Sequence, residues 1–338
     1  MMRSDLAKRL LPWFSEHKRI LPWRNSPDPY RVWLSEVMLQ QTRVAAVIPY
    51  YEKFLERFPT PAALATAEEA ELLRYWAGLG YYSRARNLQK AAQEIHREGG
   101  FPATYAGWRK LAGVGDYTAA AVASIAFGEA VAVLDGNVAR VAARLVCESG
   151  DVGNAKIRGK LREVVQNQID TLSPGDYNQA LMELGATICL PRSPKCLICP
   201  INDICCAKKR GLENSLPTKL KKNRVIEEEK EFLLLRRGTQ IALRPPDASS
   251  RRLRGFWELP HAGPGLRLRN QKQLGEFRHA IVNHIYRVTV RQAKLLGELP
   301  DLYEWISSDQ LSELPLSTMA RKSLELEVTS PAGKDKSK

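Results

Sequence analysis

The chain has 338 residues, enough for two or three domains, and its 44% hydrophobic and 26% charged content is that of a globular protein. It carries 51 Lys and Arg residues against 37 Asp and Glu residues, a formal charge of +14. This excess favours a polyanionic partner such as nucleic acid, although charge for solubility alone is the alternative. The sequence contains no run of about 18 apolar residues and no cleavable leader pattern at its start, so we expect a cytoplasmic protein without a membrane span.

Residues 1–206 have a helical pattern, because apolar residues recur at three- and four-residue spacing between Gly and Pro. In the segment DPYRVWLSEVMLQQTRVAAVIPYYEKFL, Asp28 can cap a helix and Pro29 suits its first turn. One face of the predicted helix carries Trp33, Val37, Gln40, Gln41 and Val44. The acid Glu36 lies beside that face.

Two glycines, Gly113 and Gly115, predict a tight turn in LAGVGDYTAAAVAS, directly before an Ala-rich helix. Such a turn leaves backbone NH groups unpaired at a helix N-terminus, where a phosphate oxygen can accept them. A plain interhelical turn is the alternative. Further along, in AVAVLDGNVARVAARL, Asp135 ends an apolar run and precedes Gly136, Asn137 and a new helix. On its own, Asp135 is interpreted as a helix cap.

Four cysteines crowd into the segment CLPRSPKCLICPINDIC with the spacing C-x6-C-x2-C-x5-C: Cys189, Cys196, Cys199 and Cys205. Four thiolates this close in sequence can converge on a metal centre, and in a cytoplasmic chain they favour metal over disulfides. Zinc is one candidate, but zinc sites usually have two C-x2-C pairs and only one is present. The remaining Cys147 and Cys206 are expected to be small buried hydrophobes.

A basic segment follows at residues 207–224, where Glu213 is the one acid and Gly and Pro interrupt the chain. It predicts an interdomain linker that is either a solvated tether or a phosphate contact. Beyond it, the segments EFLLLRRGTQIALR, GFWELPHA and HAIVNHIYRVTVRQAKLL are short β-type runs separated by turn residues. We therefore expect a smaller α+β domain at 225–328 and a disordered tail at 329–338.

The hairpin, the aspartate after it and the cysteine loop, in this order, resemble the helix-hairpin-helix superfamily of DNA glycosylases that includes endonuclease III. The resemblance implies a two-lobed, mainly α fold for 1–206. Its helix-hairpin-helix would lie at about 105–125 and its iron-sulfur loop at 189–205. It also implies a [4Fe-4S] cluster bound by the four clustered cysteines, and so favours iron-sulfur over zinc.

Five segments, LPWRNSPDPYRVWLSEVMLQQT, WAGLGYYSRARNL, GVGDYTAAAVASIAFG, LDGNVARV and NQALMELGATIC, resemble the MutY family of adenine DNA glycosylases across residues 9–206. The resemblance implies excision of adenine opposite 8-oxoguanine or guanine in double-stranded DNA, by a monomeric bacterial enzyme at the nucleoid. Bifunctional relatives carry a nucleophilic lysine where this chain has Tyr117. We therefore expect base excision without efficient strand cleavage.

Hydrolysis of the N-glycosidic bond needs one carboxylic acid that donates a proton and one carboxylate that stays charged. The resemblance assigns Glu36, which has apolar neighbours, as the acid that protonates adenine at N7. It assigns Asp135 as the ionised carboxylate that stabilises the sugar cation, with Tyr117 and Asn137 orienting the pair. A surface glutamate is the alternative for Glu36.

Because the target bond is hidden in a duplex, the adenine must be flipped into a pocket. The resemblance nominates Arg24 and Gln179 as adenine contacts. It nominates Gln41 and Tyr81 as wedge residues near the lesion, with Tyr82 as the neighbouring alternative to Tyr81. Tyr82 could instead be a core aromatic residue, and Gln179 could cap a turn.

The C-terminal residues resemble the family's lesion-recognition domain, which has the Nudix fold of 8-oxo-nucleotide hydrolases. The hydrolase pattern R-E-x-x-E-E is missing from the sequence, so we expect recognition rather than hydrolysis. Family members read the lesion through an F-S-H loop, and HAIVNHIYRVTV is the matching stretch here. Aligned without a gap, the loop residues are Ile281, Val282 and Asn283; with a shift of one residue, Asn283 and His284 replace S-H. Ordinary strand residues are the alternative for His279 and His284.

Two other functions remain open from the sequence. One is a bifunctional glycosylase and lyase for oxidised pyrimidines, against which Tyr117 and Glu36 argue. The other is a cluster-bearing protein that binds lesions without catalysis. The presence of both Glu36 and Asp135 argues against this second alternative.

Overall fold

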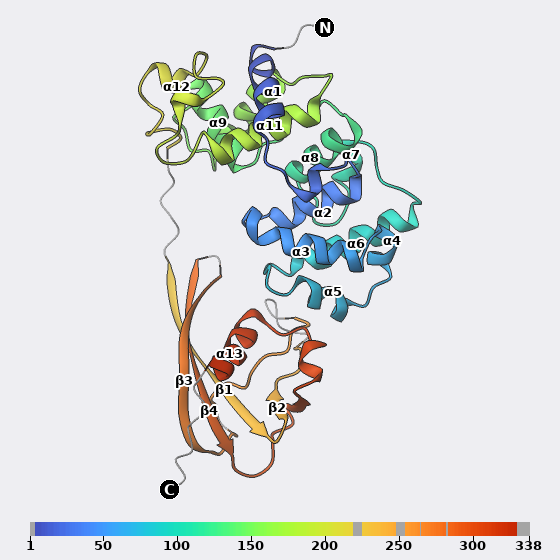
Figure 1. The fold of residues 1–338 in the computed structure, drawn as a ribbon, viewed down its shortest axis with the longest axis vertical. Helices are drawn as coiled ribbons and strands as arrows, with labels where there is room; N and C mark the ends of the chain where they lie inside the picture. The colour runs from blue at the N-terminus through green and yellow to red at the C-terminus, as the bar shows by residue number, and fades with distance from the viewer. Residues whose placement is uncertain (1–3, 219–224, 248–253, 264, 282, 330–338) are drawn as a thin grey trace. The chain divides into compact units, whose positions relative to one another are not determined.

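The computed structural model describes residues 4–218, 225–247, 254–263, 265–281 and 283–329 (Figure 1). Contacts divide the chain into two units. The first unit comprises Met1–Thr66 and Asn87–Lys221, and the second comprises Ala67–Arg86 and Lys222–Lys338. Residues 67–86 therefore group with the C-terminal residues, although the sequence division places them inside the helical part. In the described ranges, no helix has the length and apolarity needed to cross a membrane.

One core of the first unit is built by the helices α1 (Asp5–His17), α9 (Gly136–Val146), α10 (Ala155–Gln166) and α11 (Pro174–Thr187). Helix α1 begins where the Ser4 side chain accepts a hydrogen bond from the backbone NH of Ala7. Its apolar face, including Leu10 and Phe14, is buried with Leu184 of α11. Figure 1 shows α1 and α11 packed together beside α9. This packing fixes α9 and α11, which both supply residues to the candidate site.

The other helices of the first unit follow η1 (Pro22–Arg24). They include α2 (Pro29–Leu39), α3 (Val44–Arg57), α4 (Pro61–Ala65), α6 (Ser83–Arg97), α7 (Tyr105–Trp108) and α8 (Asp116–Phe127). The first turn of α6 belongs to the second unit. Two fully buried indoles, Trp33 of α2 and Trp108 of α7, lie with ring centroids 5.7 Å apart. They anchor α2 beside the helical hairpin that α7 and α8 form.

The single helix predicted from residue 29 onwards is two helices. Helix α2 begins as expected, because the Asp28 side chain accepts from the backbone NH of Arg31 and Pro29 occupies its first turn. It ends at Leu39, and Gln41 has φ 58°, in the left-handed region that a continuous helix excludes. The predicted common face of Trp33, Val37, Gln40, Gln41 and Val44 is therefore wrong beyond Leu39.

The second unit contains α5 (Glu69–Trp76), a five-stranded sheet and α13 (Thr318–Thr329). The strands are β1 (Ile226–Arg237), β2 (Gln240–Leu243), β3 (Leu268–Ile281), β4 (His284–Leu295) and β5 (Glu304–Ser307), in the order β3-β4-β1-β2-β5. Strands β1 and β4 are parallel, and the other pairs are antiparallel. Phe232, Val288 and Met319 form part of the core that joins α13 to the sheet. This mixed sheet is the smaller α+β domain that the sequence predicts.

The run GFWELPHA is not a regular strand. It makes isolated bridges, Arg244 with Glu258, Phe232 with His261 and Trp257 with Leu316.

The first half of the predicted linker packs against the first unit. Helix α12 (Cys206–Lys209) begins it, and Ala207 and Leu216 are buried. The backbone carbonyl of Leu216 accepts a hydrogen bond of 2.8 Å from Nε of Arg144. Residues 219–224 of the linker, and 330–338 of the predicted tail, lie outside the described residues.

Candidate active site

A pocket of about 730 Å³ opens in the first unit, within the size range of small-molecule sites. Its walls come from η1, α2, α8, α10, α11 and the start of α9. Nine of the predicted site residues line it, although they come from distant parts of the sequence: Arg24, Glu36, Gln41, Gly113, Gly115, Tyr117, Asp135, Asn137 and Gln179. The fold therefore brings the predicted acid, carboxylate and adenine contacts to one cavity.

Glu36 is a buried acid in the wall of this pocket, with only 6% of its surface exposed. The hydroxyl of Tyr117 donates a hydrogen bond to its Oε2. Burial raises the pKa of Glu36 to about 7; the Tyr117 hydrogen bond and the charge of Arg24 act in the opposite direction, and the charge of Asp135 adds to the increase. At neutral pH a large fraction of Glu36 therefore keeps a proton. The surface-glutamate alternative is excluded.

Tyr117 lies in the first turn of α8, between Glu36 and α11. Its hydroxyl is also 3.1 Å from the sulfur of Met182. Burial and the neighbouring carboxylates Glu36 and Asp135 raise the pKa of Tyr117 well above its usual value. The phenol therefore stays neutral and is a hydrogen-bond donor to Glu36.

Asp135 serves both as a helix cap and as a pocket residue, so the two interpretations of the sequence are compatible. Its Oδ1 accepts from the backbone NH of Val138 at 2.7 Å, and its Oδ2 accepts from the side-chain amide of Asn137 at 3.0 Å. Burial raises the pKa of Asp135, while these hydrogen bonds favour the ionised form. The donors from Val138 and Asn137 hold the carboxylate in one orientation at the start of α9.

Asn137 is held in turn by Arg140, one turn further along α9. The guanidinium of Arg140 donates to Oδ1 of Asn137 at 2.9 Å and to the backbone carbonyl of Cys189 at 2.8 Å. A direct chain of hydrogen bonds thus runs from the Asp135 carboxylate to the start of the cysteine loop. Arg140 could not be identified from the sequence, because an arginine on a helix carries no signal of its own.

A partly buried ion-pair cluster, also missed from the sequence, borders the pocket. Glu183 of α11 is 1% exposed and accepts hydrogen bonds from Arg19, at 2.6 and 3.0 Å, and from Arg24, at 2.8 Å. Burial alone would raise the pKa of Glu183, but the hydrogen bonds and charges of the two arginines outweigh it and lower the pKa. All three residues line the pocket. The guanidinium of Arg24, the predicted adenine contact, is therefore fixed in place.

The glycine turn has the predicted position before α8, and Gly113 has φ +73°. A Cβ at Gly113 would lie 2.5 Å from Cβ of Asn87, so both the backbone conformation and the space require glycine there. Gly115 is the N-cap of α8 and has open space around it. The nearby acid Asp116 is paired with Arg109 at 2.7 Å and with Arg162 at 3.3 Å. These arginines offset the negative charge next to the predicted phosphate position.

The four clustered cysteines line one small cavity between α9 and the loop before α12. Among the described residues, no group of three or more His, Cys, Asp or Glu side chains is arranged to hold a single metal ion. The four cysteine sulfurs instead border this cavity. Arg144 donates from Nη1 to Sγ of Cys189 at 3.1 Å. Four soft thiolate donors around a shared cavity, with a cation beside one of them, suit the chemistry of an anionic polynuclear cluster.

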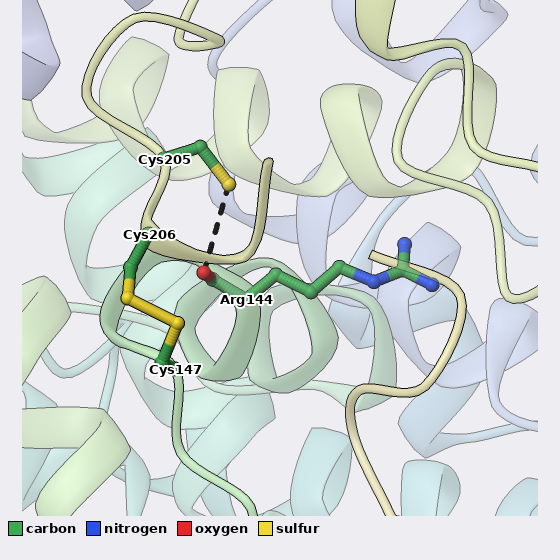
Figure 2. Close-up of a disulfide and its surroundings, with 4 residues drawn as sticks. All are labelled: Arg144, Cys147, Cys205 and Cys206. Carbon is green, nitrogen blue, oxygen red and sulfur yellow. Dashed lines mark hydrogen bonds between the residues drawn. A yellow bond between two sulfur atoms is a disulfide. The ribbon is translucent and has the colours of Figure 1, made fainter. Parts of the chain in front are cut away.

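The other two cysteines are not the small buried hydrophobes that the sequence predicts. The preference for metal over disulfides applies to the four clustered cysteines only, because these two form a disulfide. Cys147, the C-cap of α9, forms a disulfide with Cys206, the first residue of α12, with Cα atoms 5.5 Å apart (Figure 2). Figure 2 shows that Cys205, the residue before Cys206, directs its sulfur toward the backbone carbonyl of Arg144 and not toward this bond. The physical reason is that α12 packs against α9, which brings together two cysteines 59 positions apart.

The predicted wedge residues Tyr81 and Tyr82 belong to the second unit. Tyr81 has φ 48° and 37% exposure, and the Arg84 guanidinium lies 5.6 Å from its ring centroid. Tyr82 packs its ring on Phe256, and its hydroxyl is 3.2 Å from that of Thr318. Tyr82 thus has the packing of a core aromatic residue, whereas Tyr81 is exposed.

The predicted lesion-contact residues lie at the turn between β3 and β4. Asn283 is in the turn, where its backbone carbonyl accepts from the NH of Ile226, and Val282 lies outside the described residues. His284 begins β4, and its Nδ1 is 2.5 Å from Oε1 of Glu228. His279 is within β3, where burial lowers its pKa. Asn283 and His284 are therefore adjacent at a hairpin tip.

Comparisons with known proteins agree with this architecture. Residues 34–167 match the family model of the HhH-GPD superfamily base excision DNA repair proteins. Residues 189–205 match the model of the iron-sulfur binding domain of endonuclease III. This second match spans the four-cysteine loop from its first ligand to its last. The loop therefore holds a [4Fe-4S] cluster.

Two curated relatives and one solved structure illustrate the similarity. A human adenine DNA glycosylase is 46% identical over 218 residues, covering 61% of this chain and 40% of the human protein. An adenine DNA glycosylase of Buchnera aphidicola subsp. Acyrthosiphon pisum is 35% identical, covering 69% of this chain and 70% of that protein. A solved thermostable thymine-DNA glycosylase matches with a TM-score of 0.55 and 28% identity, covering 60% of this chain and 95% of the other. The chain thus spans less than half the length of the human relative.

Proposed function

Because the chain belongs to the adenine DNA glycosylase family of the helix-hairpin-helix superfamily, we propose that it is a monofunctional glycosylase of base excision repair. Its substrate is adenine mispaired with 8-oxoguanine or guanine in double-stranded DNA. It acts as a monomer at the bacterial nucleoid. The observation that carries the proposal is the buried side chain of Glu36, whose pKa is raised to about 7, in the same pocket as the capped carboxylate of Asp135.

Glu36 is the general acid of this reaction. A pKa of about 7 lets the side chain be protonated at neutral pH and still transfer the proton readily, which is the condition for efficient acid catalysis. Proton transfer to N7 makes adenine a better leaving group. Tyr117 orients the acid, because its neutral hydroxyl donates to one carboxyl oxygen and leaves the other for the base.

Asp135 stabilises the positive charge that develops on the sugar as the bond breaks. Its hydrogen bonds from Val138 and Asn137 favour its charged form and hold both oxygens before the reaction begins. Water then adds to the sugar, and free adenine and an abasic site are the products. No lysine occupies the position of Tyr117, so the abasic strand stays intact.

The pocket supplies contacts for the flipped base. Arg24 is held by Glu183 and can present donors to adenine, and Gln179 lines the same wall. Gln41 and Tyr81, the proposed wedge residues, both have left-handed backbone conformations, which cost energy and are concentrated at functional sites. The packing of Tyr82 on Phe256 supports Tyr81 as the wedge.

The remaining parts of the chain bind and position DNA. Cys189, Cys196, Cys199 and Cys205 would hold the [4Fe-4S] cluster, and the bound cluster would cross-link residues 189–205. The formal charge of +14 favours association with the phosphate backbone. The second unit is a Nudix-like domain, in which the hairpin tip with Asn283 and His284 reads the 8-oxoguanine.

Single-turnover incubation with a labelled duplex containing adenine opposite 8-oxoguanine tests the proposal. The adenine strand should break only after alkali treatment. Glu36→Gln and Asp135→Asn should both abolish the release of adenine, and a duplex with thymine opposite adenine is the matched substrate control. Strand scission without alkali would indicate a lyase. DNA binding without release of adenine would indicate a lesion-binding protein.

A further inference from the structure

We propose that Glu183 is a positioning residue that holds Arg19 and Arg24 at the pocket wall and offsets part of their positive charge, so that Glu36 keeps its proton at neutral pH. This inference rests on the proposed role of Glu36 as the acid. It adds a function for a residue that touches neither Glu36 nor, in the proposed mechanism, the reacting bond.

The contacts of Glu183 use its whole carboxylate. Oε1 accepts from Nε of Arg19 at 2.6 Å and from the backbone NH of Arg19 at 3.3 Å. Oε2 accepts from Nη2 of Arg19 at 3.0 Å and from Nη2 of Arg24 at 2.8 Å. Arg24 is further held by a 3.1 Å bond from Nη1 to the Arg19 carbonyl and lies over the Phe14 ring. One carboxylate therefore fixes two guanidinium groups.

The burial of this cluster makes its charge balance consequential. The side chain of Glu183 is fully buried and that of Arg24 is 13% exposed, so solvent screens their charges poorly. Arg24 is the cation whose charge lowers the pKa of Glu36. With Glu183 ionised, a single negative charge offsets part of that effect. Without it, two cations would face the pocket without a buried counter-charge.

The other charged and titratable groups around Glu36 have partners of their own. The pocket wall contributes Tyr117 and Asp116 from α8, Asp135 from the cap of α9, Arg158 from α10, and Arg19, Arg24 and Glu183. Asp116 is paired with Arg109 and Arg162, and Arg158 donates to the carbonyl of Leu134 at 2.7 Å. Glu183 is thus the acid in this wall that is hydrogen-bonded to the arginine facing Glu36.

Replacing Glu183 by Gln keeps the shape of the side chain and removes its charge. The positive charge of Arg24 then acts on Glu36 with less compensation, and Glu36 loses its proton at lower pH. The rate of adenine release should therefore fall off at lower pH than in the unchanged protein. A midpoint lowered by one pH unit would reduce the rate about tenfold at pH values above both midpoints.

The experiment measures the single-turnover rate of adenine release between pH 5 and 9, a range of about two units on either side of the pKa of Glu36, with the full-length, cluster-loaded protein. The variants are Glu183→Gln, Glu183→Asp and Arg24→Gln. We expect a lower midpoint for Glu183→Gln and an unchanged midpoint for Glu183→Asp, which keeps the charge. Arg24→Gln removes the cation, so its midpoint should move to higher pH.

The opposite directions of these shifts separate charge balance from a structural role. A rate that falls by the same factor at every pH in Glu183→Gln would overturn the inference. If Glu183→Gln does not fold, as judged by its melting curve, Arg24→Gln alone decides, and an unshifted midpoint there would overturn it. Adenine release by the unchanged protein in the same assay tests the proposed function separately.

Discussion

Replacing Glu36 by Gln should make the protein more stable at alkaline pH while it abolishes adenine release. The wild-type side chain is buried, and its pKa is raised from the ordinary 4.5 to about 7. A carboxyl group whose pKa is higher in the folded state stabilises the fold fully below the unfolded pKa. This contribution is lost as the pH rises through the folded pKa. The stabilising contribution of Glu36 is therefore lost between about pH 4.5 and pH 7.

The magnitude follows from the same two values. Each pH unit of difference in pKa corresponds to about 1.4 kcal/mol, so the rise from 4.5 to about 7 corresponds to about 3 kcal/mol. Gln carries no charge at any pH and has nearly the same shape. For a unit of this size, 3 kcal/mol raises the melting temperature by roughly 6 to 12 °C.

The assay compares the apparent melting temperatures of wild type and Glu36→Gln at pH 5 and pH 8.5, a pair that brackets the window from 4.5 to about 7. At pH 5 both side chains are largely neutral and the difference should be small. At pH 8.5 the variant should melt well above wild type. A difference in melting temperature that is the same at both pH values would refute the conclusion that Glu36 is a buried acid with a raised pKa. If Glu36 were exposed to solvent, wild type and variant would have the same melting temperature at both pH values.

Three further results are expected. Tyr117→Phe removes the hydrogen bond that lowers the pKa of Glu36, so adenine release should slow and its alkaline midpoint should move to higher pH in single-turnover assays; a lower midpoint would contradict this role. Cys199→Ser should lose bound iron and visible absorbance, whereas retention of a full cluster would remove Cys199 from the ligands. Cys147→Ala removes a disulfide that spans 59 positions and should lower the free energy of unfolding by up to about 4 kcal/mol, less with the cluster bound. The melting temperature of wild type should then depend on added reductant, whereas that of the variant should not.

The elements that the sequence predicts well are those with local signals. Asp28 and Pro29 start α2, the glycine turn precedes α8, and Asp135 caps α9, because each signal lies within one turn of the helix it starts. The end of α2 at Leu39 has no such signal, since neither Gly nor Pro follows it. The predicted helix therefore ran on through Gln41.

The part of the candidate site that the sequence predicts depends on the family resemblance and not on local signals. Local patterns left Glu36 and Asp135 as ordinary residues, and the family resemblance placed them in one site. The ion-pair cluster was missed because Arg19 and Glu183 are 164 positions apart and charge patterns reveal only close neighbours on a helix. The disulfide was missed because only the packing of α12 on α9 brings Cys147 and Cys206 together.

The disulfide between Cys147 and Cys206 affects how the protein responds to oxidation, because all four cluster ligands lie inside the covalent loop that it closes. Oxidative loss of iron would free four thiols within that loop, and Cys205 directly precedes the disulfide-bonded Cys206 in the chain. Thiolates attack disulfides and exchange partners with them. Loss of the metal would thus be followed by shuffling of the covalent connectivity. A protein that has lost its cluster could be rebuilt with iron and sulfide only after a dithiol has restored the original pairing.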